Sequence, residues 1–495
     1  MGPASLRSPR EVAFSGLADF GLRLLLLSAL GTCKCHALFL AEVSRPRVLL
    51  FLIDGLRWDY LEEPHLPGFE ELADTGVKAE YVVPVMPTNS YPNWYSIVTG
   101  LYAEEHGFVH NYMYDEKYDD YFLMAPHPNA SNPHWWNHAE PVWVTAEKNG
   151  LRTGMYYWDG CQVEIRGVKP TICFPYRNFG KWPTAERDTK AAISEAVRKL
   201  KQNALDFALV YYEAVDAAGH EYGPDSRERK EALKSADYLL KHLLDEATKY
   251  NIRDQLSIIV VSDHGMTDTG FDKNDVIDIE PHIDDNDLHC MLDAGAFSML
   301  RPHSDKIDKV YAKLKSLNMK GLNVFRREDL PESYHLKDSY LTQPIVLTTD
   351  PGYLLLKASS LRHRKNGHSV SFRTLLTNFM LLLQLRLTES EKQMPKSNKT
   401  VGGGHGYDPM KLVDMRTVFL ATGPGLKQGF ENKPVRMVDH YNVICRQLGI
   451  QPLQNSGSHD NIRDMFVDGA ASGSAVASVS LLLVLDILLV TPVYL

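Results

Sequence analysis

Residues 47–54 read Arg-Val-Leu-Leu-Phe-Leu-Ile-Asp, an unbroken apolar stretch that closes on the carboxylate of Asp54. Two later stretches repeat this arrangement, because the apolar residues 207–212 and 256–261 also lead into polar side chains. Apolar runs without polar alternation are typical of strands buried on both faces, as in a parallel sheet covered by helices. The sequence therefore predicts an α/β fold with a mostly parallel central sheet and helices on both of its faces.

The side chains that follow these three runs can all bind a metal ion. Asp54 follows the first run, Asp216 the second, and Asp263 with His264 the third. In open α/β sheets the ligand site lies beyond the carboxyl ends of the strands, where these side chains would meet. We therefore expect one composite site at that edge of the sheet.

The 495 residues are 44% hydrophobic and 23% charged, which is ordinary globular composition. The formal net charge of -9 argues against nucleic acid as a partner, because contacts with a phosphate backbone need clustered Lys and Arg side chains.

We predict one catalytic domain over residues 46–460, with helical patterns at 189–201 and 227–250 between the apolar runs. Residues 359–387 interrupt this pattern with a basic stretch followed by an apolar one. This atypical insertion is either a helix-bearing surface segment or an artefact of the gene prediction, and we assign it no chemistry.

The N-terminus has the pattern of a secretory signal peptide over residues 1–37. Arg7, Arg10 and Arg23 precede an apolar run at 24–30, and small residues stand before a cleavage point after Ala37. The expected location is therefore outside the cytosol.

The C-terminal residues 469–495 have the pattern of a glycosylphosphatidylinositol (GPI) attachment signal. Small residues at 469–471 are followed by a short polar spacer and by an apolar tail that reaches the last residue. A tail-anchored hydrophobic helix is the alternative. Both interpretations place the protein at the extracellular face of a membrane, which fits the glycosylation sequons at Asn129 and Asn398.

Two histidines extend the set of candidate metal ligands. His220 follows Asp216 by four residues, and His405 lies in the glycine-rich stretch Gly-Gly-Gly-His-Gly at 402–406. Asp and His ligands without a thiolate suit catalytic Zn²⁺. Together with Asp54, Asp263 and His264, they are numerous enough for two metal ions.

A nucleophile is predicted within the segment 87–96. Pro92 suits the first turn of a helix, so Ser90 would stand at the N-terminus of that helix. There the helix dipole favours an ionised hydroxyl and an anionic phosphate.

With these residues assembled, the chain resembles the ectonucleotide pyrophosphatase/phosphodiesterase family of the alkaline phosphatase superfamily over most of residues 46–455. The motifs that carry the resemblance are, in chain order, Asp54, Thr88-Asn89-Ser90-Tyr91-Pro92-Asn93, Thr99-Gly100-Leu101-Tyr102, Asn111, Asp216 to His220, Ser262-Asp263-His264-Gly265-Met266 and Gly404-His405-Gly406-Tyr407.

This resemblance implies a phosphodiesterase with two Zn²⁺ ions and a phospho-serine intermediate on Ser90. Its implied ligand sets are Asp216, His220 and His405 for one zinc, and Asp54, Ser90, Asp263 and His264 for the other. Asn111 would donate a hydrogen bond to a phosphate oxygen.

Within the family, the segments most similar to the choline-specific glycerophosphodiesterases are 135–137, 140–145, 155–158, 161–173, 441–445 and 448–450. Those members cleave glycerophosphocholine and lysophosphatidylcholine and release phosphocholine. A quaternary ammonium group favours aromatic faces near a carboxylate. Tyr211, close to Asp216, is the candidate aromatic wall, and we expect both residues to lie against the substrate.

Two alternatives are open at this point. The first is a nucleotide pyrophosphatase/phosphodiesterase, in which Tyr91 stacks on a base; the second, more remote, is an inactive cell-surface binding protein.

The cysteines predict one local disulfide bond. Cys161 and Cys173 are close in sequence, and a bridge between them would contribute roughly 3 kcal/mol in a chain-entropy estimate. Cys290 and Cys445 would then pair with each other or stay free, or Cys445 would link two chains in a homodimer.

Overall fold

The computed structural model describes residues 45–178, 182–269, 275–355, 362–365, 368–371 and 402–467. The predicted signal peptide at 1–37, the predicted attachment signal at 469–495 and the sequon at Asn398 lie outside these residues. Of the predicted insertion 359–387, the structure describes two short strands, β17 (Arg362–Lys365) and β18 (His368–Ser371), which pair antiparallel.

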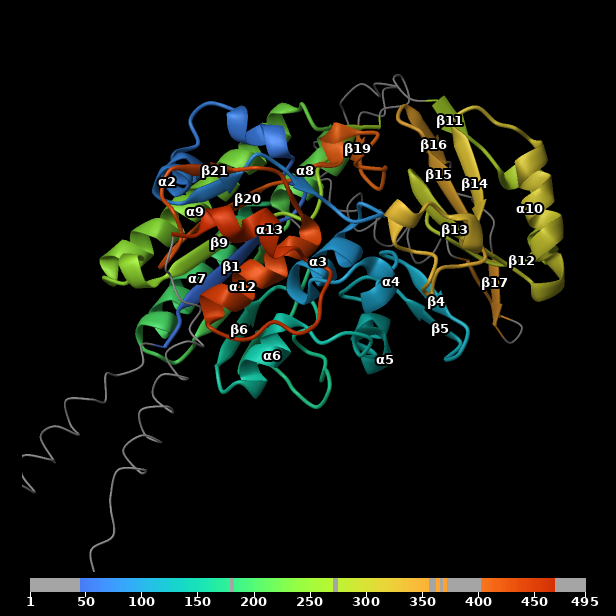
Figure 1. Ribbon diagram of the computed structural model, residues 1–495. Helices are drawn as coiled ribbons and strands as arrows, with labels where there is room; N and C mark the ends of the chain where they lie inside the picture. The colour runs from blue at the N-terminus through green and yellow to red at the C-terminus, as the bar shows by residue number, and fades with distance from the viewer. Residues whose placement is uncertain are drawn as a thin grey trace, which may run out of the picture. The chain divides into compact units, whose positions relative to one another are not determined.

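A central eight-stranded sheet carries the fold (Figure 1). Its strands lie in the order β21 (Phe430–Asn432), β2 (Val77–Ala79), β20 (Phe419–Thr422), β9 (Ser257–Val261), β1 (Val48–Ile53), β8 (Phe207–Tyr212), β6 (Thr153–Tyr156) and β7 (Ile172–Phe174). Five of the seven strand pairings are parallel, and only those that involve β20 are antiparallel. The prediction of a mostly parallel sheet is therefore confirmed.

All six residues of β1 are buried, as its unbroken apolar sequence predicts. Val48, Leu50 and Leu52 belong to the hydrophobic cluster on one face of the sheet, and the alternate residues of the strand belong to the cluster on the other face. Because successive side chains of a strand point to opposite faces, only a strand covered on both sides can bury every residue.

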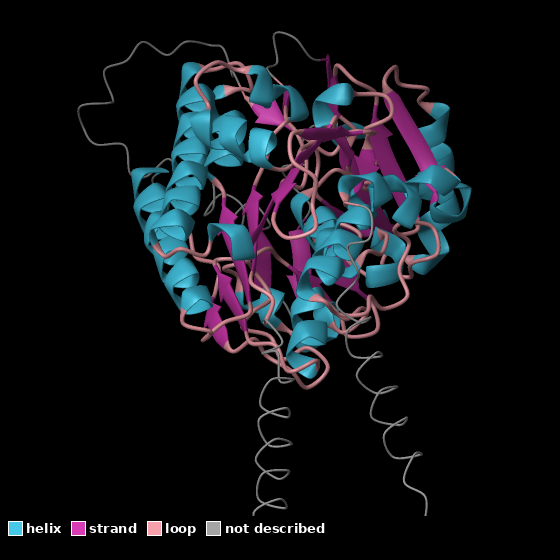
Figure 2. Cartoon of the chain, turned by 60° about the vertical axis from the view of Figure 1, so that its left-hand side comes forward, coloured by secondary structure: helices cyan, strands magenta, loops and turns pink. Residues whose placement is uncertain are grey.

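Two helical layers supply this cover (Figures 1 and 2). One layer contains α2 (Pro67–Thr75), α7 (Trp182–Lys201) and α9 (Arg227–Lys249), and the other contains α3 (Ser90–Thr99), α6 (Val142–Lys148) and α12 (His440–Leu448). Short helices follow in the connections: α4 (Ala103–His106), α5 (Pro133–Trp136), α8 (Ala214–Tyr222) and α13 (His459–Ile462).

The two predicted helical patterns are confirmed. The pattern at 227–250 corresponds to α9, and the pattern at 189–201 corresponds to the C-terminal part of α7. α7 begins at Trp182, seven residues earlier than its apolar periodicity indicates. Pro183 stands in its first turn, where the missing amide hydrogen costs no helical hydrogen bond.

A second, smaller sheet was not predicted from the sequence. It consists of β12 (Leu288–Leu292), β13 (Phe297–Pro302), β15 (Ile345–Thr349) and β14 (Leu322–Arg326), all paired antiparallel, with α10 (Ile307–Ser316) packed against it. Further two-stranded pairs are β4 (Met113–Asp115) with β5 (Asp120–Phe122), β3 (Val82–Val83) with β22 (Val435–Arg436), β10 (Thr267–Asp268) with β19 (Gly403–Gly404), and β11 (Asp275–Ile277) with β16 (Tyr353–Leu355).

The predicted disulfide bond between Cys161 and Cys173 is present. Cys290 and Cys445 are both free and buried, so the alternative in which they pair with each other is wrong. Cys445 lies in α12 with an exposed fraction of 0%, which leaves no accessible thiol for the predicted homodimer linkage.

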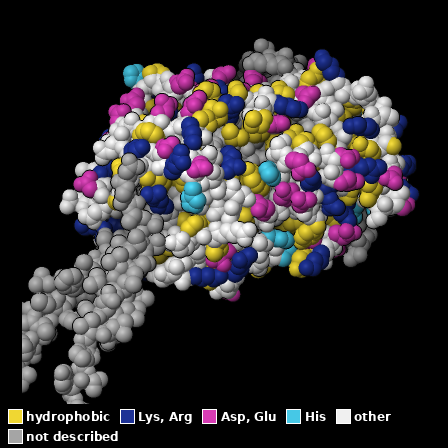
Figure 3. Space-filling view, viewed as in Figure 1, with side chains coloured by type: hydrophobic (Ala, Val, Ile, Leu, Met, Phe, Trp, Pro, Cys, Tyr) yellow, Lys and Arg dark blue, Asp and Glu magenta, His cyan; other side chains and the backbone are white. Residues whose placement is uncertain are grey.

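Among the described helices, no helix combines the length and apolar composition that a bilayer crossing requires. On the face seen in Figure 3, Lys and Arg side chains are interspersed with Asp and Glu side chains.

Candidate active site

The candidate ligands lie at the carboxyl edge of the central sheet. β8 and β9 flank β1 in parallel register, so the three strands end side by side. Asp54 directly follows β1, Asp216 stands in α8 just after β8, and Asp263 and His264 follow β9. The structure therefore brings together the side chains that the sequence pattern placed at one edge.

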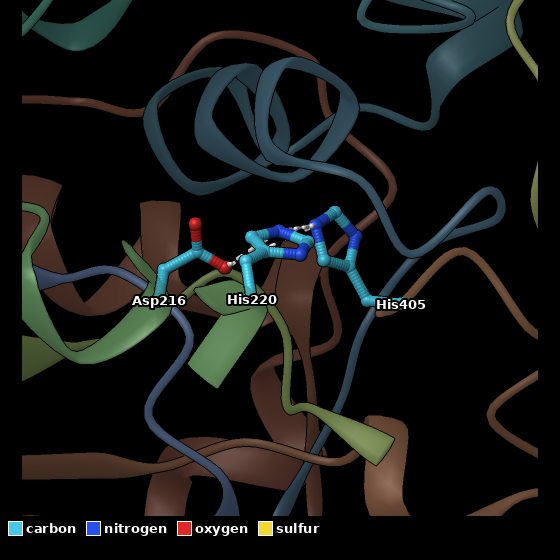
Figure 4. Close-up of side chains that lie close together, drawn as sticks. All are labelled: Asp216, His220 and His405. Carbon is cyan, nitrogen blue, oxygen red and sulfur yellow. Dashed lines mark hydrogen bonds and ion pairs between the residues drawn. The ribbon is translucent and has the colours of Figure 1, made fainter. Parts of the chain in front are cut away.

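Helix α8 presents Asp216 and His220 on the same side, because residues four positions apart are neighbours on a helix surface. Nε2 of His220 lies 3.3 Å from Oδ1 of Asp216. His405 comes from the loop after β19, and its Nε2 lies 3.2 Å from Nε2 of His220 (Figure 4). The pairing of β19 with β10, which lies just after His264, brings this distant loop to the site.

A second group of ligand atoms adjoins the first. Nε2 of His264 lies 3.5 Å from Oδ1 of Asp54, 3.4 Å from Oδ2 of Asp263 and 3.3 Å from Oγ of Ser90. The second group lies directly beside the first. Asp216 of the first group offers a ligand atom that lies within 4.8 Å of ligand atoms of Asp54 and His264. The His264 and His405 rings are stacked, with centroids 3.6 Å apart.

The backbone fixes the tautomer of all three histidines. In each, Nδ1 faces a main-chain carbonyl oxygen: that of Gly403 for His220 (2.8 Å), Thr88 for His405 (2.8 Å) and Gly265 for His264 (3.0 Å). A carbonyl oxygen can only accept, so Nδ1 carries a hydrogen in each ring and Nε2 faces the site. This arrangement is usual for histidines that bind metal ions.

The buried carboxylate oxygens of the site are suited to bind a cation. Oδ1 of Asp54 and Oδ1 of Asp216 are buried and have no hydrogen-bond partner in the described structure. Burial, followed by the charges of Asp263 and Asp216, raises the pKa of Asp54 well above its usual value. Several carboxylates and imidazoles converge here with few hydrogen-bond donors for the buried oxygens, and a divalent cation would balance their negative charge.

Burial also acts on His405, whose side chain is 10% exposed. Burial, followed by the neighbouring His264 and His220, lowers the pKa of His405 well below its usual value. The neutral imidazole is the form that can bind a metal ion.

Two aromatic residues hold the carboxylates in place. The hydroxyl of Tyr211 donates to Oδ2 of Asp54 at 2.6 Å, and Nε1 of Trp94 donates to Oδ2 of Asp263 at 2.7 Å. The two rings meet edge to face, with centroids 5.0 Å apart. Sequence analysis missed both hydrogen bonds, because partners so far apart in the chain leave no local pattern.

Ser90 stands at the first position of α3, as predicted, with Asn89 as the N-cap residue. Its side chain is half-buried at the positive end of the helix. Asn111 is 7% exposed, and its Oδ1 accepts a hydrogen bond from the backbone N–H of Tyr91 at 2.9 Å. That bond leaves Nδ2 of Asn111 as the donor beside the start of α3.

The arrangement can perform nucleophilic displacement on an anionic substrate. A hydroxyl lies beside an imidazole at a helix N-terminus, and the neighbouring carboxylates and imidazoles form two overlapping groups that could hold a metal ion. The His220 side chain, 43% exposed, marks the solvent-facing side of this site.

Comparison with known proteins agrees with this geometry. The sequence profile of the family described as Type I phosphodiesterase / nucleotide pyrophosphatase matches residues 48–408. Ectonucleotide pyrophosphatase/phosphodiesterase family member 7 of Homo sapiens is 31% identical over 428 residues, which cover 84% of this chain and 83% of that protein. Bis(5'-adenosyl)-triphosphatase ENPP4 of Bos taurus is 30% identical over 451 residues, which cover 90% of this chain and 87% of that protein.

The structure is similar to that of murine ectonucleotide pyrophosphatase / phosphodiesterase 5. The TM-score is 0.71 at 29% identity, and the match covers 85% of this chain and 100% of that one. An inactive variant of the same murine protein has been solved in complex with AMP, and it matches with a TM-score of 0.69 at 27% identity, over 85% of this chain and 100% of that one.

Proposed function

The chain belongs to the Type I phosphodiesterase / nucleotide pyrophosphatase family, and we propose that it hydrolyses choline-containing phosphodiesters such as glycerophosphocholine and lysophosphatidylcholine. Family membership makes it a phosphoric diester hydrolase. The substrate class, the roles of individual residues and the identity of the metal are the content of the proposal.

The position of the Ser90 hydroxyl is the observation that supports the proposed reaction type. Oγ of Ser90 lies at the N-terminus of α3 and 3.3 Å from Nε2 of His264, beside two buried carboxylate oxygens that have no hydrogen-bond partner in the described structure. A nucleophilic hydroxyl, an electropositive helix end and a cation-binding set of ligands together favour attack on a phosphodiester.

Two Zn²⁺ ions fit the donor set of imidazole nitrogens and carboxylate oxygens. The proposed ligands are Asp216, His220 and His405 for one ion, and Asp54, Ser90, Asp263 and His264 for the other. Bound there, the ions would supply positive charge that favours an ionised hydroxyl and offsets charge on the phosphoryl oxygens.

The side chains of this chain then have distinct tasks. Oγ of Ser90 attacks phosphorus in line with the leaving oxygen, a new P–O bond forms on serine, and the ester bond to the leaving alcohol breaks. Nδ2 of Asn111 and the first backbone amides of α3 donate to the nonbridging oxygens. Water then hydrolyses the phospho-serine and restores the hydroxyl.

Recognition of choline needs aromatic surface and negative charge beside the phosphoryl group that is transferred to Ser90, because the choline ester stays on phosphorus while the glycerol side leaves. Tyr211 is only 4% exposed, and its hydroxyl is bound to Asp54. Tyr176 lies next to it, with ring centroids 6.0 Å apart, and its hydroxyl donates to Oε2 of Glu213 at 2.7 Å. The partly exposed Tyr176 and Glu213, which lie beside Tyr211, support the choline proposal.

Nucleotide hydrolysis is the second candidate, favoured by the similarity to the bovine bis(5'-adenosyl)-triphosphatase and by the AMP complex of the murine relative. The specific role predicted for Tyr91 is wrong. Tyr91 is 3% exposed, its hydroxyl donates to Asp159 at 2.7 Å, and its ring is packed against Trp94 and Phe122, so no base can stack on it.

A substrate panel tests the proposal. The purified protein is incubated with glycerophosphocholine, lysophosphatidylcholine, sphingomyelin and a nitrophenyl nucleotide ester, each with and without a chelator. We expect release of phosphocholine from the first two, loss of activity on chelation and recovery with added zinc. Turnover of the nucleotide ester alone would reject the choline assignment, and full activity after exhaustive chelation, or restored by magnesium alone, would reject the two-zinc assignment.

The proposed location is the extracellular face of the plasma membrane, with a GPI anchor near residues 469–471. The C-terminal sequence pattern supports this proposal.

A further inference from the structure

Asn89 occupies an unusual position at the start of α3. Asparagine at an N-cap normally accepts a hydrogen bond from an amide of the first helical turn. The Asn89 side chain makes no such bond, although it is only 6% exposed. Its polar groups are directed to other elements instead.

The side-chain oxygen of Asn89 faces the ring of His405. Oδ1 lies 3.1 Å from Nδ1 of His405, and the carbonyl oxygen of Thr88 lies 2.8 Å from the same nitrogen. Two consecutive residues thus share one N–H group. This double contact fixes the rotation of the imidazole and holds Nε2 toward His220.

Thr88, the residue before Asn89, also holds the backbone of the two residues that follow His405. Oγ1 of Thr88 donates to the carbonyl oxygen of Tyr407 and accepts from the N–H of Gly406, each at 2.9 Å. A Cβ atom at Gly406 would lie 3.1 Å from Oδ1 of Asn89, and the backbone there has a φ of +102°, so glycine permits the close approach.

The orientation of the Asn89 amide follows from these contacts. Because Nδ1 of His405 donates, the oxygen must face it. The amide nitrogen lies 3.1 Å from Nε2 of the fully buried His110, whose Nδ1 accepts from the N–H of Tyr112, so this contact is one of packing and not a hydrogen bond. The His110 ring is stacked on Phe297, with centroids 5.5 Å apart. This packing leaves the amide little room to turn away from His405.

We propose that Asn89 is a positioning residue that aligns His405 for metal binding and ties the metal-binding loop to the helix that carries Ser90. The inference rests on the proposed role of His405 as a ligand. Asn89 is adjacent to the nucleophile in sequence, so a movement of the start of α3 is transmitted to the ligand loop through Asn89 together with Thr88. Partners of this kind typically change metal affinity by about 10- to 100-fold.

Metal retention by the full chain, without substrate, is the direct test. Zinc-loaded wild type, Asn89→Leu and Asn89→Asp are dialysed against graded chelator, and the bound zinc is counted. We expect Asn89→Leu to lose one zinc equivalent at roughly 10- to 100-fold lower free chelator and to keep the other. Asn89→Asp keeps an acceptor for Nδ1 and should restore retention.

Asn442→Leu is the matched control. Asn442 is also a buried asparagine, 2% exposed and hydrogen-bonded to Asn455, but it lies in α12. The Asn442→Leu variant should have a lower melting temperature than wild type and the same zinc retention. If Asn89→Leu does not fold, Asn89→Ala removes the same acceptor without the added branched bulk.

Equal zinc retention in wild type and Asn89→Leu would overturn the inference, and so would a loss of zinc in Asn89→Asp as large as in Asn89→Leu. A wild-type chain that binds no zinc would overturn both this inference and the two-zinc proposal. Loss of zinc in Asn89→Leu alongside an inactive wild type would leave the inference standing and reject the proposed function.

Discussion

Oγ of Ser90 and Nε2 of His264 lie 3.3 Å apart although 174 positions separate the two residues in the chain. The contact joins the start of α3, on one face of the central sheet, to the end of β9 inside it. Because both elements are fixed by buried apolar packing, the hydroxyl is held at the ligand cluster without any local sequence constraint between them.

Replacing Ser90 by Ala should lower turnover by several orders of magnitude, as expected when a nucleophile is removed. Zinc content should fall little, because the carboxylate and imidazole ligands remain. Turnover and metal counting on the same preparation check this prediction. Ser304→Ala, at an exposed serine beside the small sheet, is the control and should behave as wild type. A Ser90→Ala protein with more than about a tenth of wild-type turnover would assign the nucleophile elsewhere.

Two variants of Tyr211 separate its two roles. Tyr211→Phe removes the hydroxyl that donates to Asp54 and should depress choline and non-choline substrates to the same extent. Tyr211→Ala also removes the ring and should weaken choline substrates by a further 1 to 2 kcal/mol or so, the size of a desolvated cation–π contact. Comparison of kcat/KM for glycerophosphocholine and a nitrophenyl phosphodiester measures the difference.

Tyr212→Phe is the matched control for these variants. The Tyr212 hydroxyl lies 2.6 Å from Oγ of Ser235, and its ring belongs to the cluster on the opposite face of the sheet. It should leave both activities unchanged. An equal loss of the two activities in Tyr211→Ala would mean that the ring only packs, and the choline pocket would have to lie elsewhere.

His440 should make the fold sensitive to acid. Burial is the main reason that the pKa of His440 is lowered to about 4, from an ordinary value near 6.5. Between these two values the unfolded chain binds more protons than the folded one, so the free energy of unfolding falls as the pH falls from about 6.5 to about 4. At roughly 1.4 kcal/mol per pKa unit, this residue accounts for about 3 kcal/mol.

Urea unfolding of chelated wild type and His440→Phe at several pH values checks this prediction. The ring of Phe419 stacks on His440 with centroids 4.9 Å apart, so a phenyl ring suits the site. The variant should gain stability relative to wild type as the pH is lowered from 7 to 4. Parallel stability curves for the two proteins would show that His440 does not take part in the acid response.

Cys445 should not link two chains. Its sulfur is buried in α12, and burial is the main reason that the pKa of this thiol is raised to about 12, so little reactive thiolate forms at neutral pH. Non-reducing electrophoresis should show a monomer for both wild type and Cys445→Ser. A wild-type dimer that disappears in Cys445→Ser would show that α12 opens in solution.

Phosphatidylinositol-specific phospholipase C should release the active enzyme from intact cells. A chain truncated after residue 467 should be secreted into the medium and serves as the control. Retention of the full-length protein after treatment would favour the tail-anchored helix over the GPI anchor.

The sequence by itself determined those features that depend on short-range periodicity. The buried run at β1 predicts a strand covered on both faces, and the four-residue spacing of Asp216 and His220 places both on one side of a helix. The position of Ser90 at a helix start follows from Pro92. Each of these features is fixed by steric preferences within one or two turns of chain, and sequence patterns report such preferences directly.

Only the tertiary structure decided which distant residues meet. The arrival of His405 depends on the pairing of β19 with β10, and the hydrogen bonds of Tyr211 and Trp94 to the acidic ligands cross between separate elements. The burial of Tyr91 and Cys445, which bears on two of the expectations, likewise follows from how the layers pack. The free energy of such contacts comes from apolar burial summed over the whole core, so no single stretch of sequence encodes them.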